Sequence, residues 1–331
     1  MMLQFFGAPA RLCAFLALSL ACGCTGESTP QQQGAIRIAV IPKGTLHDFW
    51  GSVHEGAKQA AAELGVTVEW KGPDPEGDRE AQVRVVENFV SKGVKGIVLA
   101  PVDDRALAPV VAEAAAAGIP TVVIDSALQG SKHVAYVATD NKQGGALAAR
   151  HLGGLLGGKG TVVVLRFMEG SASTMEREAG FLETLAAEFP GVKVLSDNQY
   201  GGDSEKAYKA AESLLTAHPQ VDAAFASNES TSMGMLRALQ DAKLAGKVRF
   251  CGFDSSPRLA EGLVQGAVHG LVLQDPVAIG REGVRAMVAH LRGTPVQRDL
   301  RTALVLATPQ NLADAQVKSL LFPAGSGAAA K

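Results

Sequence analysis

Two large aromatic rings and a series of hydrogen-bonding side chains follow the predicted strands of this chain. Phe49 and Trp50 are adjacent, shortly after a run of β-branched residues, in a chain that is only 5% aromatic. Aromatic rings offer flat apolar plates to the C–H faces of a sugar, and Asp, Asn, Gln and Arg bond to hydroxyl groups. These residue types favour a binding site for a neutral, hydroxyl-rich ligand. The alternative is that both rings belong to the hydrophobic core.

The candidate polar residues lie at the ends of predicted strands. In open parallel sheets, ligands bind beyond the carboxyl ends of the strands. The segments at these ends are rich in Asp, Asn, Gln, Arg and Ser, and they cover residues 42–50, 100–104, 125–126, 166–177, 227–229, 253–255 and 274–275. A carboxylate at such a position can instead cap the helix that follows, which is the alternative for Asp140 and for Asp103 or Asp104.

Strand and helix patterns alternate regularly from residue 35 to residue 293. Short apolar runs predict strands that are buried on both faces, and apolar residues at helical spacing lie between them. The predicted strands cover residues 35–41, 67–71, 96–101, 120–125, 160–166, 193–197, 222–227, 248–254 and 268–274, and the predicted helices cover residues 48–64, 80–93, 106–118, 141–156, 174–189, 204–218, 231–242, 256–266 and 276–293. This alternation is typical of parallel sheets with right-handed crossovers. We therefore predict an α/β fold with two doubly wound parallel-sheet lobes.

The composition narrows the possible functions. A chain of 331 residues is long enough for two domains, and its formal net charge of -2, without a Lys/Arg-rich run, gives no field that would attract nucleic acid. The predicted globular part holds a single cysteine, Cys251, so it can form neither a disulfide framework nor a cysteine metal site. We find no G-x-S-x-G motif and no metal-binding spacing of histidines. The sequence predicts neither an enzyme nor a cofactor or metal site.

The beginning of the chain has the pattern of an export signal. Arg11 precedes an apolar run, residues 12–20, that is too short to span a bilayer as a helix. The small residues in LSLACGC, directly before cysteine, resemble a bacterial lipoprotein signal. Either Cys22 or Cys24 is then the lipidated residue, and we favour Cys22. The alternative is an ordinary cleaved signal with incidental cysteines.

Eight stretches carry a resemblance to a known family. In chain order they are TLHDFWGSVHEGAKQAAAELG, GIVLAPVDDRAL, GIPTVVIDS, VATDNKQGG, EREAGF, LLTAHPQVDAAFASNES, GFDSSP and VLQDPVAIGREGV. Their order and spacing resemble the periplasmic sugar-binding proteins of ABC importers, in the ribose- and galactose-binding type I class. These proteins share their ligand-binding fold with the lactose-repressor family of regulators. The resemblance extends from about residue 35 to residue 323.

The resemblance implies two lobes joined by a hinge of three segments, near residues 138–142, 272–276 and 298–303. The predicted division is a signal peptide over residues 1–21, a flexible tether over 22–34, an N-terminal lobe over 35–138 plus 275–300, a C-terminal lobe over 139–274 plus 301–323, and a disordered tail over 324–331. A ligand that touches both lobes favours their closed arrangement. We expect a monomer that presents the closed lobes to a membrane permease and catalyses no reaction.

The resemblance also assigns ligand contacts to the positions that match the family's cleft. These are His47, Phe49, Trp50, Asp125, Arg177, Asn228, Asp254 and Gln274. Four positions depart from the ribose binders: Ser126 stands in place of an arginine, no arginine lies near Met175, Gly202 replaces a frequent phenylalanine, and His47 replaces an asparagine. These departures put ribose in doubt and suggest a larger or differently shaped ligand.

We therefore predict an extracytoplasmic, lipid-anchored protein of the periplasm or the outer face of the cell envelope, which binds a small sugar for an ABC importer. The alternative is a non-sugar ligand, such as an autoinducer-type diol, a polyol or a nucleoside, that serves import or a sensor. A transcription regulator of the same fold would need a DNA-binding helix-turn-helix before residue 35, where the export signal stands instead. We expect no nucleic-acid partner, and contact with the membrane through the lipid anchor alone.

Overall fold

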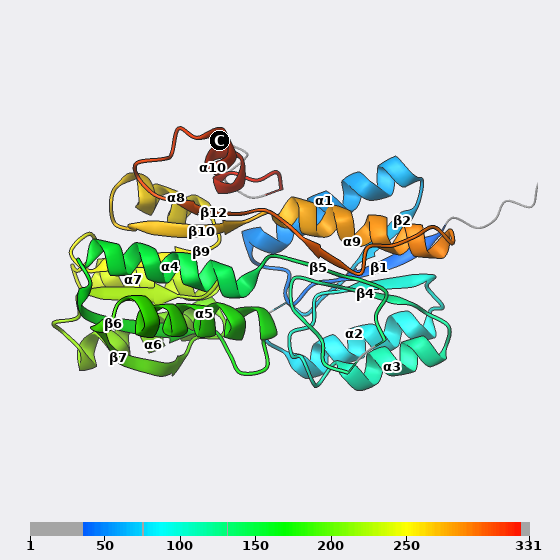
Figure 1. The fold of residues 1–331 in the computed structure, drawn as a ribbon. Coiled ribbons are helices and arrows are strands. Elements are labelled where there is room, and N and C mark those ends of the chain that lie inside the picture. Colours follow the sequence, from blue (N-terminus) through cyan, green and yellow to red (C-terminus); the bar gives the residue numbers. More distant parts are fainter. Residues whose placement is uncertain (1–35, 75, 131, 326–331) are drawn as a thin grey trace, which may run out of the picture. The chain divides into compact units, whose positions relative to one another are not determined.

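The structure is a computed structural model that describes residues 36–74, 76–130 and 132–325. The predicted signal peptide and tether, with both candidate lipidation cysteines, lie outside these residues. The described chain forms two six-stranded sheets with helices on both faces of each sheet (Figure 1). The predicted α/β fold with two doubly wound sheets is confirmed.

The first sheet is parallel throughout. Its strands are β1 (Arg37–Ile41), β2 (Thr67–Trp70), β3 (Gly96–Leu99), β4 (Thr121–Ile124), β5 (Tyr136–Ala138) and β11 (Asp299–Arg301), in the order β11-β5-β4-β3-β1-β2. β3 and β4 are buried along their whole length, as expected of strands that are covered on both faces.

The second sheet repeats this order of strands with one antiparallel edge. Its strands are β6 (Lys159–Arg166), β7 (Gly191–Tyr200), β8 (Ala223–Ala226), β9 (Arg249–Phe253), β10 (Gly270–Gln274) and β12 (Leu304–Ala307), in the order β12-β10-β9-β8-β6-β7. β12 runs antiparallel to β10, and the other pairs are parallel. The carboxyl ends of the parallel strands therefore meet at one edge of each sheet, where a ligand site is expected.

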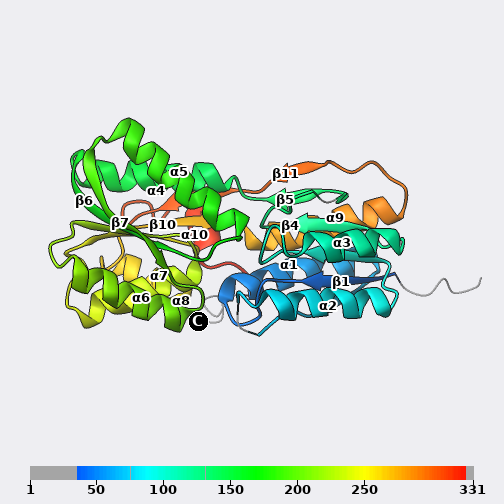
Figure 2. The ribbon, with the colours of Figure 1, turned by 90° about the horizontal axis from the view of Figure 1, so that it is seen from below.

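Alternate residues of β1 pack on opposite faces of the first sheet. Ile38 and Val40 face α1 (Asp48–Leu64) and α9 (Pro276–Leu291), whereas Ala39 and Ile41 face α2 (Arg79–Ser91) and α3 (Ala108–Ala116). This period of two follows from the pleat of a strand. Figure 2 shows α1 and α2 on either side of β1.

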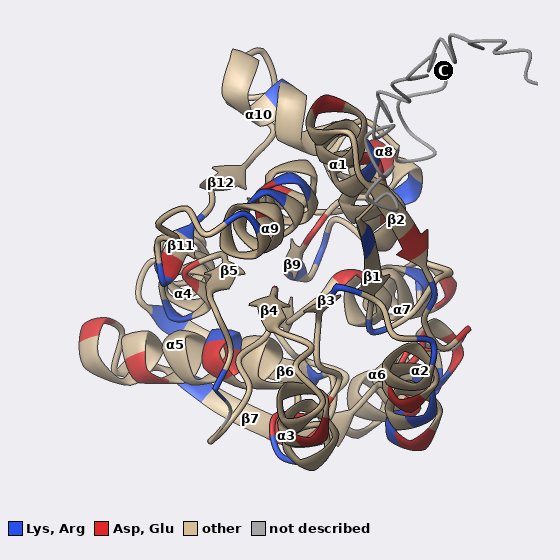
Figure 3. Ribbon diagram, turned by 90° about the vertical axis from the view of Figure 1, so that its right-hand side faces the viewer, with Lys and Arg blue, Asp and Glu red and all other residues tan. Residues whose placement is uncertain are grey.

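The second sheet is covered in the same way. Helices α4 (Asn141–Leu155) and α5 (Ala172–Glu188) pack on one face. Helices α6 (Ser204–Ala217), α7 (Glu229–Asp241), α8 (Pro257–Val264) and α10 (Ala315–Leu321) pack on the other. Figure 3 shows Lys and Arg beside Asp and Glu on α2, which agrees with the small net charge of the chain.

The chain passes between the two sheets three times. β5 belongs to the first sheet, but α4 directly after it packs on the second. β10 belongs to the second sheet, but α9 after it packs against α1 on the first. The third passage joins β11 in the first sheet to β12 in the second.

Four elements were not predicted from the sequence, namely β5, β11, β12 and α10. All four are short, and β5 and β11 have only three residues each. The predicted strand at residues 193–197 is also longer in the structure, because β7 has ten residues and runs along the edge of its sheet with mostly exposed or half-buried side chains. Among the described residues, no helix is both long and apolar enough to cross a membrane.

Candidate functional site

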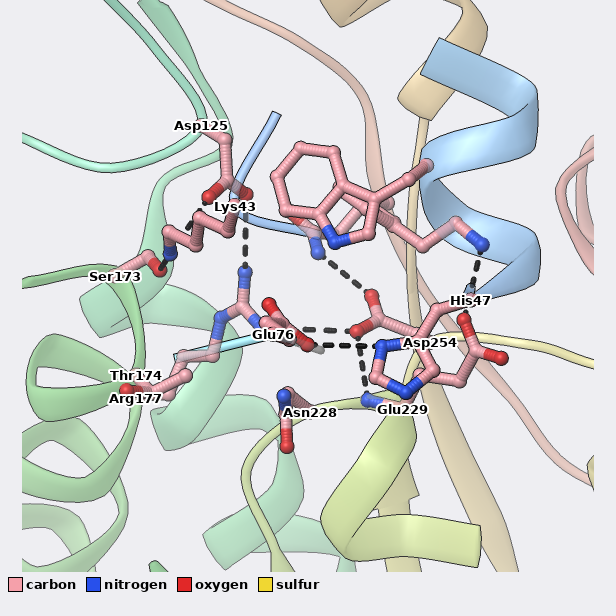
Figure 4. A pocket seen from close by; sticks show the side chains of 13 residues that line it. Lys43, His47, Glu76, Asp125, Ser173, Thr174, Arg177, Asn228, Glu229 and Asp254 are labelled. Atoms are coloured by element: carbon pink, nitrogen blue, oxygen red, sulfur yellow. Dashed lines mark hydrogen bonds and ion pairs between the residues drawn. The ribbon is translucent and has the colours of Figure 1, made fainter. Parts of the chain in front are cut away.

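All eight predicted ligand residues line one pocket (Figure 4). It encloses about 290 Å³, including the part that opens to solvent. The lining consists of Lys43, His47, Phe49, Trp50, Glu76, Asp125, Ser173, Thr174, Arg177, Asn228, Glu229, Asp254 and Gln274. Side chains from both sheets and their helices meet here, at the carboxyl ends of the strands.

Two aspartates at strand ends share an unusual backbone conformation. Asp125 follows β4 and Asp254 follows β9, with φ angles of 61° and 68°. Asp and Asn enter this left-handed region more readily than most residues, because their short side chains can bond locally. The turn ends each strand abruptly and leaves one buried carboxyl group on each side of the pocket.

Arg177 lies between these two carboxyl groups. It comes from α5 and is almost fully buried, with its Nη atoms 3.9 Å from Asp125 Oδ1 and 3.8 Å from Asp254 Oδ2. Its Nε donates to Asn141 Oδ1 at 2.9 Å, and its guanidinium stacks on the Phe253 ring at 4.0 Å. A guanidinium held in this way offers its remaining N–H groups in a fixed direction. Burial raises the pKa of Asp254, although the charge of Arg177 opposes the rise.

The two amide residues hold their neighbours in place. The Oδ1 atom of Asn228 accepts from Thr231 N and Thr231 Oγ1, which caps α7 and leaves the amide nitrogen for the pocket. Gln274 accepts from Thr139 Oγ1 at 2.7 Å and donates to Asp254 Oδ1 at 2.6 Å. Gln274 therefore fixes the orientation of the Asp254 carboxyl group.

Phe49 and Trp50 belong to the core and to the pocket at once. Both are buried, pack in the hydrophobic cluster between the first sheet and α9, and line the pocket. Their rings meet edge to face, with centroids 4.9 Å apart and an interplanar angle of 89°. The indole hydrogen-bonds to Glu76. The two interpretations of the ring pair are thus compatible, because a ring packed on one side can still face the pocket on the other.

Five lining residues were not predicted: Lys43, Glu76, Ser173, Thr174 and Glu229. All but Glu76 lie in the strand-end segments 42–50, 166–177 and 227–229, so the strand-end rule selects their segments but not the residues. Lys43 is fully satisfied by protein groups, with its Nζ 2.9 Å from Ser173 Oγ and 2.9 Å from Asp125 Oδ2. It neutralises the Asp125 carboxylate from the side opposite Arg177.

The cleft between the two sheets is closed by direct contacts. Asp104 N donates to Gly170 O at 2.8 Å, and Ser173 N donates to Ser126 Oγ at 3.0 Å. Glu229, at the start of α7, accepts from backbone N–H groups at the start of α1. Burial raises the pKa of Glu229 to about 8, although the charge of His47 and a backbone N–H oppose the rise.

The alternative role as a helix cap holds for Asp140, which accepts from Gln143 N at the start of α4. Asp103 accepts from the N–H groups of Arg105 and Ala106 in the turn before α3, so it stabilises that turn and does not cap the helix. Asp275 caps α9. Cys251 is buried in β9 as a free thiol. Within the described ranges, no group of three or more His, Cys, Asp and Glu side chains is placed to hold a metal ion.

His47 and Glu76 form a buried pair next to the rings. The Nδ1 atom of His47 lies 2.9 Å from Glu76 Oε2. Burial lowers the pKa of His47, but the hydrogen bond and charge of Glu76, with the charges of Glu229 and Asp254, outweigh burial and raise the pKa to about 9. Burial acts to raise the pKa of Glu76, yet the hydrogen bond to His47 holds it below its usual value. The pair is therefore ionised at neutral pH.

We expect this pair to make stability depend on pH. A histidine whose pKa is higher in the folded state than in the unfolded state stabilises the fold. This stabilisation is complete at a pH below the ordinary histidine pKa of 6.5, and it is lost as the pH rises through about 9. The melting temperature should fall over this window, and the fall should be smaller in His47→Gln. Calorimetry of both proteins across the window measures the difference, and parallel profiles would contradict the charged pair.

Comparison with known proteins gives one consistent result at the sequence level. The profile of the periplasmic binding protein domain family matches residues 38–295. The chain is 30% identical over 275 residues to the ribose import binding protein of Escherichia coli (strain K12), which covers 82% of this chain and 90% of that protein. It is 32% identical over 263 residues to the D-ribose/D-allose-binding protein of Pseudomonas aeruginosa, with 76% and 80% covered.

Solved structures show the same similarity. An ABC-transporter solute-binding protein from Agrobacterium vitis with bound D-fucose has a TM-score of 0.83 and 33% identity, and the match covers 86% of this chain and 100% of that one. A carbohydrate transporter solute-binding protein from Agrobacterium radiobacter, in complex with D-arabinose, also has a TM-score of 0.83 and 33% identity, with 87% and 99% covered. Matches of this extent span both sheets.

Proposed function

The chain belongs to the periplasmic binding protein domain family, among the type I sugar-binding proteins of ABC importers, and on that premise we propose that it captures one small neutral sugar between its lobes and hands it to a membrane permease. The observation that carries this proposal is the convergence of aromatic rings and polar side chains from both lobes on one pocket. The relatives are named for ribose and allose, and the similar structures hold D-arabinose and D-fucose. All of these are neutral sugars.

The charges around the pocket favour a neutral ligand. Three basic side chains line the pocket, and each lies within ion-pair distance of an acidic one: the pairs are Lys43–Asp125, His47–Glu76 and Arg177–Asp254. A carboxylate or phosphate on the ligand would meet buried acidic groups at short range, where little water screens the repulsion. Hydroxyl groups, which donate and accept, suit a lining of this mixed kind.

We assign the contacts with the sugar as follows. Phe49 and Trp50 face its C–H surface, and the polar contacts come from His47, Asp125, Arg177, Asn228 and Asp254. Gln274 acts by orienting Asp254. The pocket is small, because its free space of about 290 Å³ includes the part that opens to solvent. The size favours a pentose or a hexose over an oligosaccharide, even though Ser126 and Gly202 depart from the ribose binders.

A melting-temperature screen tests the proposed function. The panel contains pentoses, hexoses, polyols and nucleosides, so that the non-sugar alternative is included. Binding to the native state raises the melting temperature in proportion to the logarithm of ligand excess. We expect a rise with at least one pentose or hexose. A rise with polyols or nucleosides alone would replace the sugar by the alternative class of ligand.

Binding should also change the fluorescence of Trp50. The ring lines the pocket, whereas the second tryptophan, Trp70, lies in β2 and stacks on His54 at 4.4 Å. We expect the sugar that raises the melting temperature to change the emission of a Trp70→Phe variant, in which Trp50 is the only indole. A sugar that raises the melting temperature but leaves this emission unchanged would place the ligand away from the ring pair.

The family places the protein in the periplasm, and we propose that a lipid on Cys22 anchors it to the membrane there. Support comes from the LSLACGC stretch, which lies outside the described residues. Membrane fractionation of Cys22→Ser and Cys24→Ser tests this. Release of Cys22→Ser alone is the expected result, and a wild-type protein that is already in the soluble fraction would indicate an ordinary cleaved signal.

We further propose that the protein acts as a monomer and catalyses no reaction, with the hinge near residues 138–142, 272–276 and 298–303. The three passages of the chain between the sheets support this division into lobes. Recovery of the bound sugar unchanged after prolonged incubation is the expected result, and turnover would contradict a pure binding role.

A further inference from the structure

Helix α1 has no N-cap of its own. The residue at its N-cap position, His47, makes no side-chain capping hydrogen bond. The first backbone N–H groups of a helix have no partner within the helix and need an acceptor from outside. In α1 these first groups belong to Asp48 and Phe49. Phe49 is also one of the two rings at the pocket, so the start of α1 bears directly on the site.

The acceptor for both N–H groups comes from the other lobe. Glu229 is the first residue of α7, and its carboxyl oxygens accept from Asp48 N at 3.2 Å and from Phe49 N at 2.9 Å. The residue is only 6% exposed. Because α1 packs on the first sheet and α7 on the second, these two bonds require the closed cleft.

We propose that Glu229 is a positioning residue for closure: it caps α1 across the cleft and so stabilises the closed arrangement in addition to the contacts made by the sugar. The inference rests on the proposed function of a two-lobe binding protein. Each oxygen of Glu229 already accepts one backbone N–H. The same contact holds the Phe49 backbone, and with it the ring, against the pocket.

The charges around Glu229 agree with this role. Burial raises the pKa of its carboxyl group to about 8, and the Phe49 N–H bond and the charge of His47 act in the opposite direction. Burial of an acidic group is costly unless hydrogen bonds compensate for it. At the start of α1 part of the compensation comes from the two backbone N–H groups that donate to the carboxyl oxygens.

The decisive comparison is between Asp48→Pro and Asp48→Ala. Both variants lose the same side chain, but only proline removes the N–H that donates to Glu229 Oε1, and its ring carbon then occupies the path of that bond. Neither change alters a side chain that lines the pocket. Proline is favourable at the first helical position, and His47 already has the extended backbone that a following proline requires, with φ -91° and ψ 148°.

We expect the sugar to dissociate about tenfold faster from Asp48→Pro than from Asp48→Ala, which corresponds to the loss of one hydrogen bond. Association should be the same in both, and Asp48→Pro should melt no lower than Asp48→Ala without sugar. The probes are D-ribose, D-allose, D-arabinose and D-fucose, measured by stopped-flow fluorescence. Equal dissociation rates would overturn the inference and leave the proposed function intact.

A second measurement does not need a sugar. Amide hydrogen exchange at Phe49 in the sugar-free variants should be faster in Asp48→Pro than in Asp48→Ala, because the remaining bond to Glu229 forms only in closed molecules. If none of the four probe sugars binds the wild-type protein, this exchange comparison still decides the inference, and the wider melting-temperature panel decides the proposed function. Equal exchange at Phe49 in both variants would overturn it.

Discussion

Replacing Asp254 with asparagine is expected to weaken sugar binding about 100-fold or more while the protein remains folded. Both oxygens of Asp254 accept N–H groups, from Gln274 Nε2 at 2.6 Å and from Glu229 N at 3.1 Å. An asparagine must turn its own NH₂ group toward one of these donors, and it leaves Arg177 without one of its two carboxyl neighbours. Truncation of one partner of a buried hydrogen-bonded charge pair costs about 2–5 kcal/mol in affinity, and every 1.4 kcal/mol is about tenfold.

The choice of substitution and control makes this experiment specific. Asparagine tolerates the φ angle of 68° at position 254, whereas alanine would add backbone strain. Asp275→Asn is the matched control, because Asp275 follows Gln274 directly but caps α9 and does not line the pocket. Asparagine caps helices as well as aspartate does. Calorimetric titration should show weakened binding in Asp254→Asn alone, and an unchanged affinity in that variant would remove Asp254 from the site.

The fully buried strands and the long helices of the fold could be predicted from the sequence, whereas the short elements β5, β11, β12 and α10 could not. β3, β4 and β8 are continuous apolar runs without an exposed residue, and such runs predict strands covered on both faces. β11 has three residues, Asp299–Arg301, of which the two ends are exposed, so its pairing with β5 depends on where the segment after α9 brings the chain. The local sequence pattern around residues 299–301 does not indicate this tertiary contact.

All eight predicted site residues line one pocket. They could be predicted because the strand-end rule and the resemblance select the same positions. The missing residues are those whose role depends on a partner from another element. Lys43 is recognisable only once Asp125 and Ser173 lie beside it. In the sequence, Glu229 resembles any acidic residue in the first turn of a helix, where the negative charge stabilises the helix to which the residue belongs. Its bonds to α1 depend on a contact between residues 180 positions apart, which no local spacing indicates.

The two lobes share one plan, although the sequence shows too little self-similarity for a repeat. The strand orders correspond position by position, so that β4 with Asp125 matches β9 with Asp254. The crossing helices correspond as well: α9 packs on α1, and α4 packs on α5. At each of these contacts the helices meet through glycines. A Cβ at Gly280 would lie 1.9 Å from Val53 O, and a Cβ at Gly145 would lie 1.8 Å from Arg177 O.

The glycine contact in the second lobe leads to the second large effect. Gly145→Ala is expected to destabilise the protein by about 3 kcal/mol or more, because two backbones must separate to admit one methyl group. The backbone that must move carries Arg177, so the affinity for sugar should fall together with the stability. Guanidinium unfolding and calorimetric titration measure the two losses.

Gly154→Ala is the matched control, since it makes the same change in the same helix but should have the opposite effect on stability. A Cβ at Gly154 would meet no atom within 4 Å. Alanine in a helix is about 0.5–1 kcal/mol more favourable than glycine, so this variant should be as stable as the wild type or more stable, with unchanged affinity. If Gly145→Ala and Gly154→Ala behave alike, α4 and α5 are not in backbone contact at Gly145. The position of Arg177 would then have to be set by its hydrogen bonds to Asn141 and Ser227 alone.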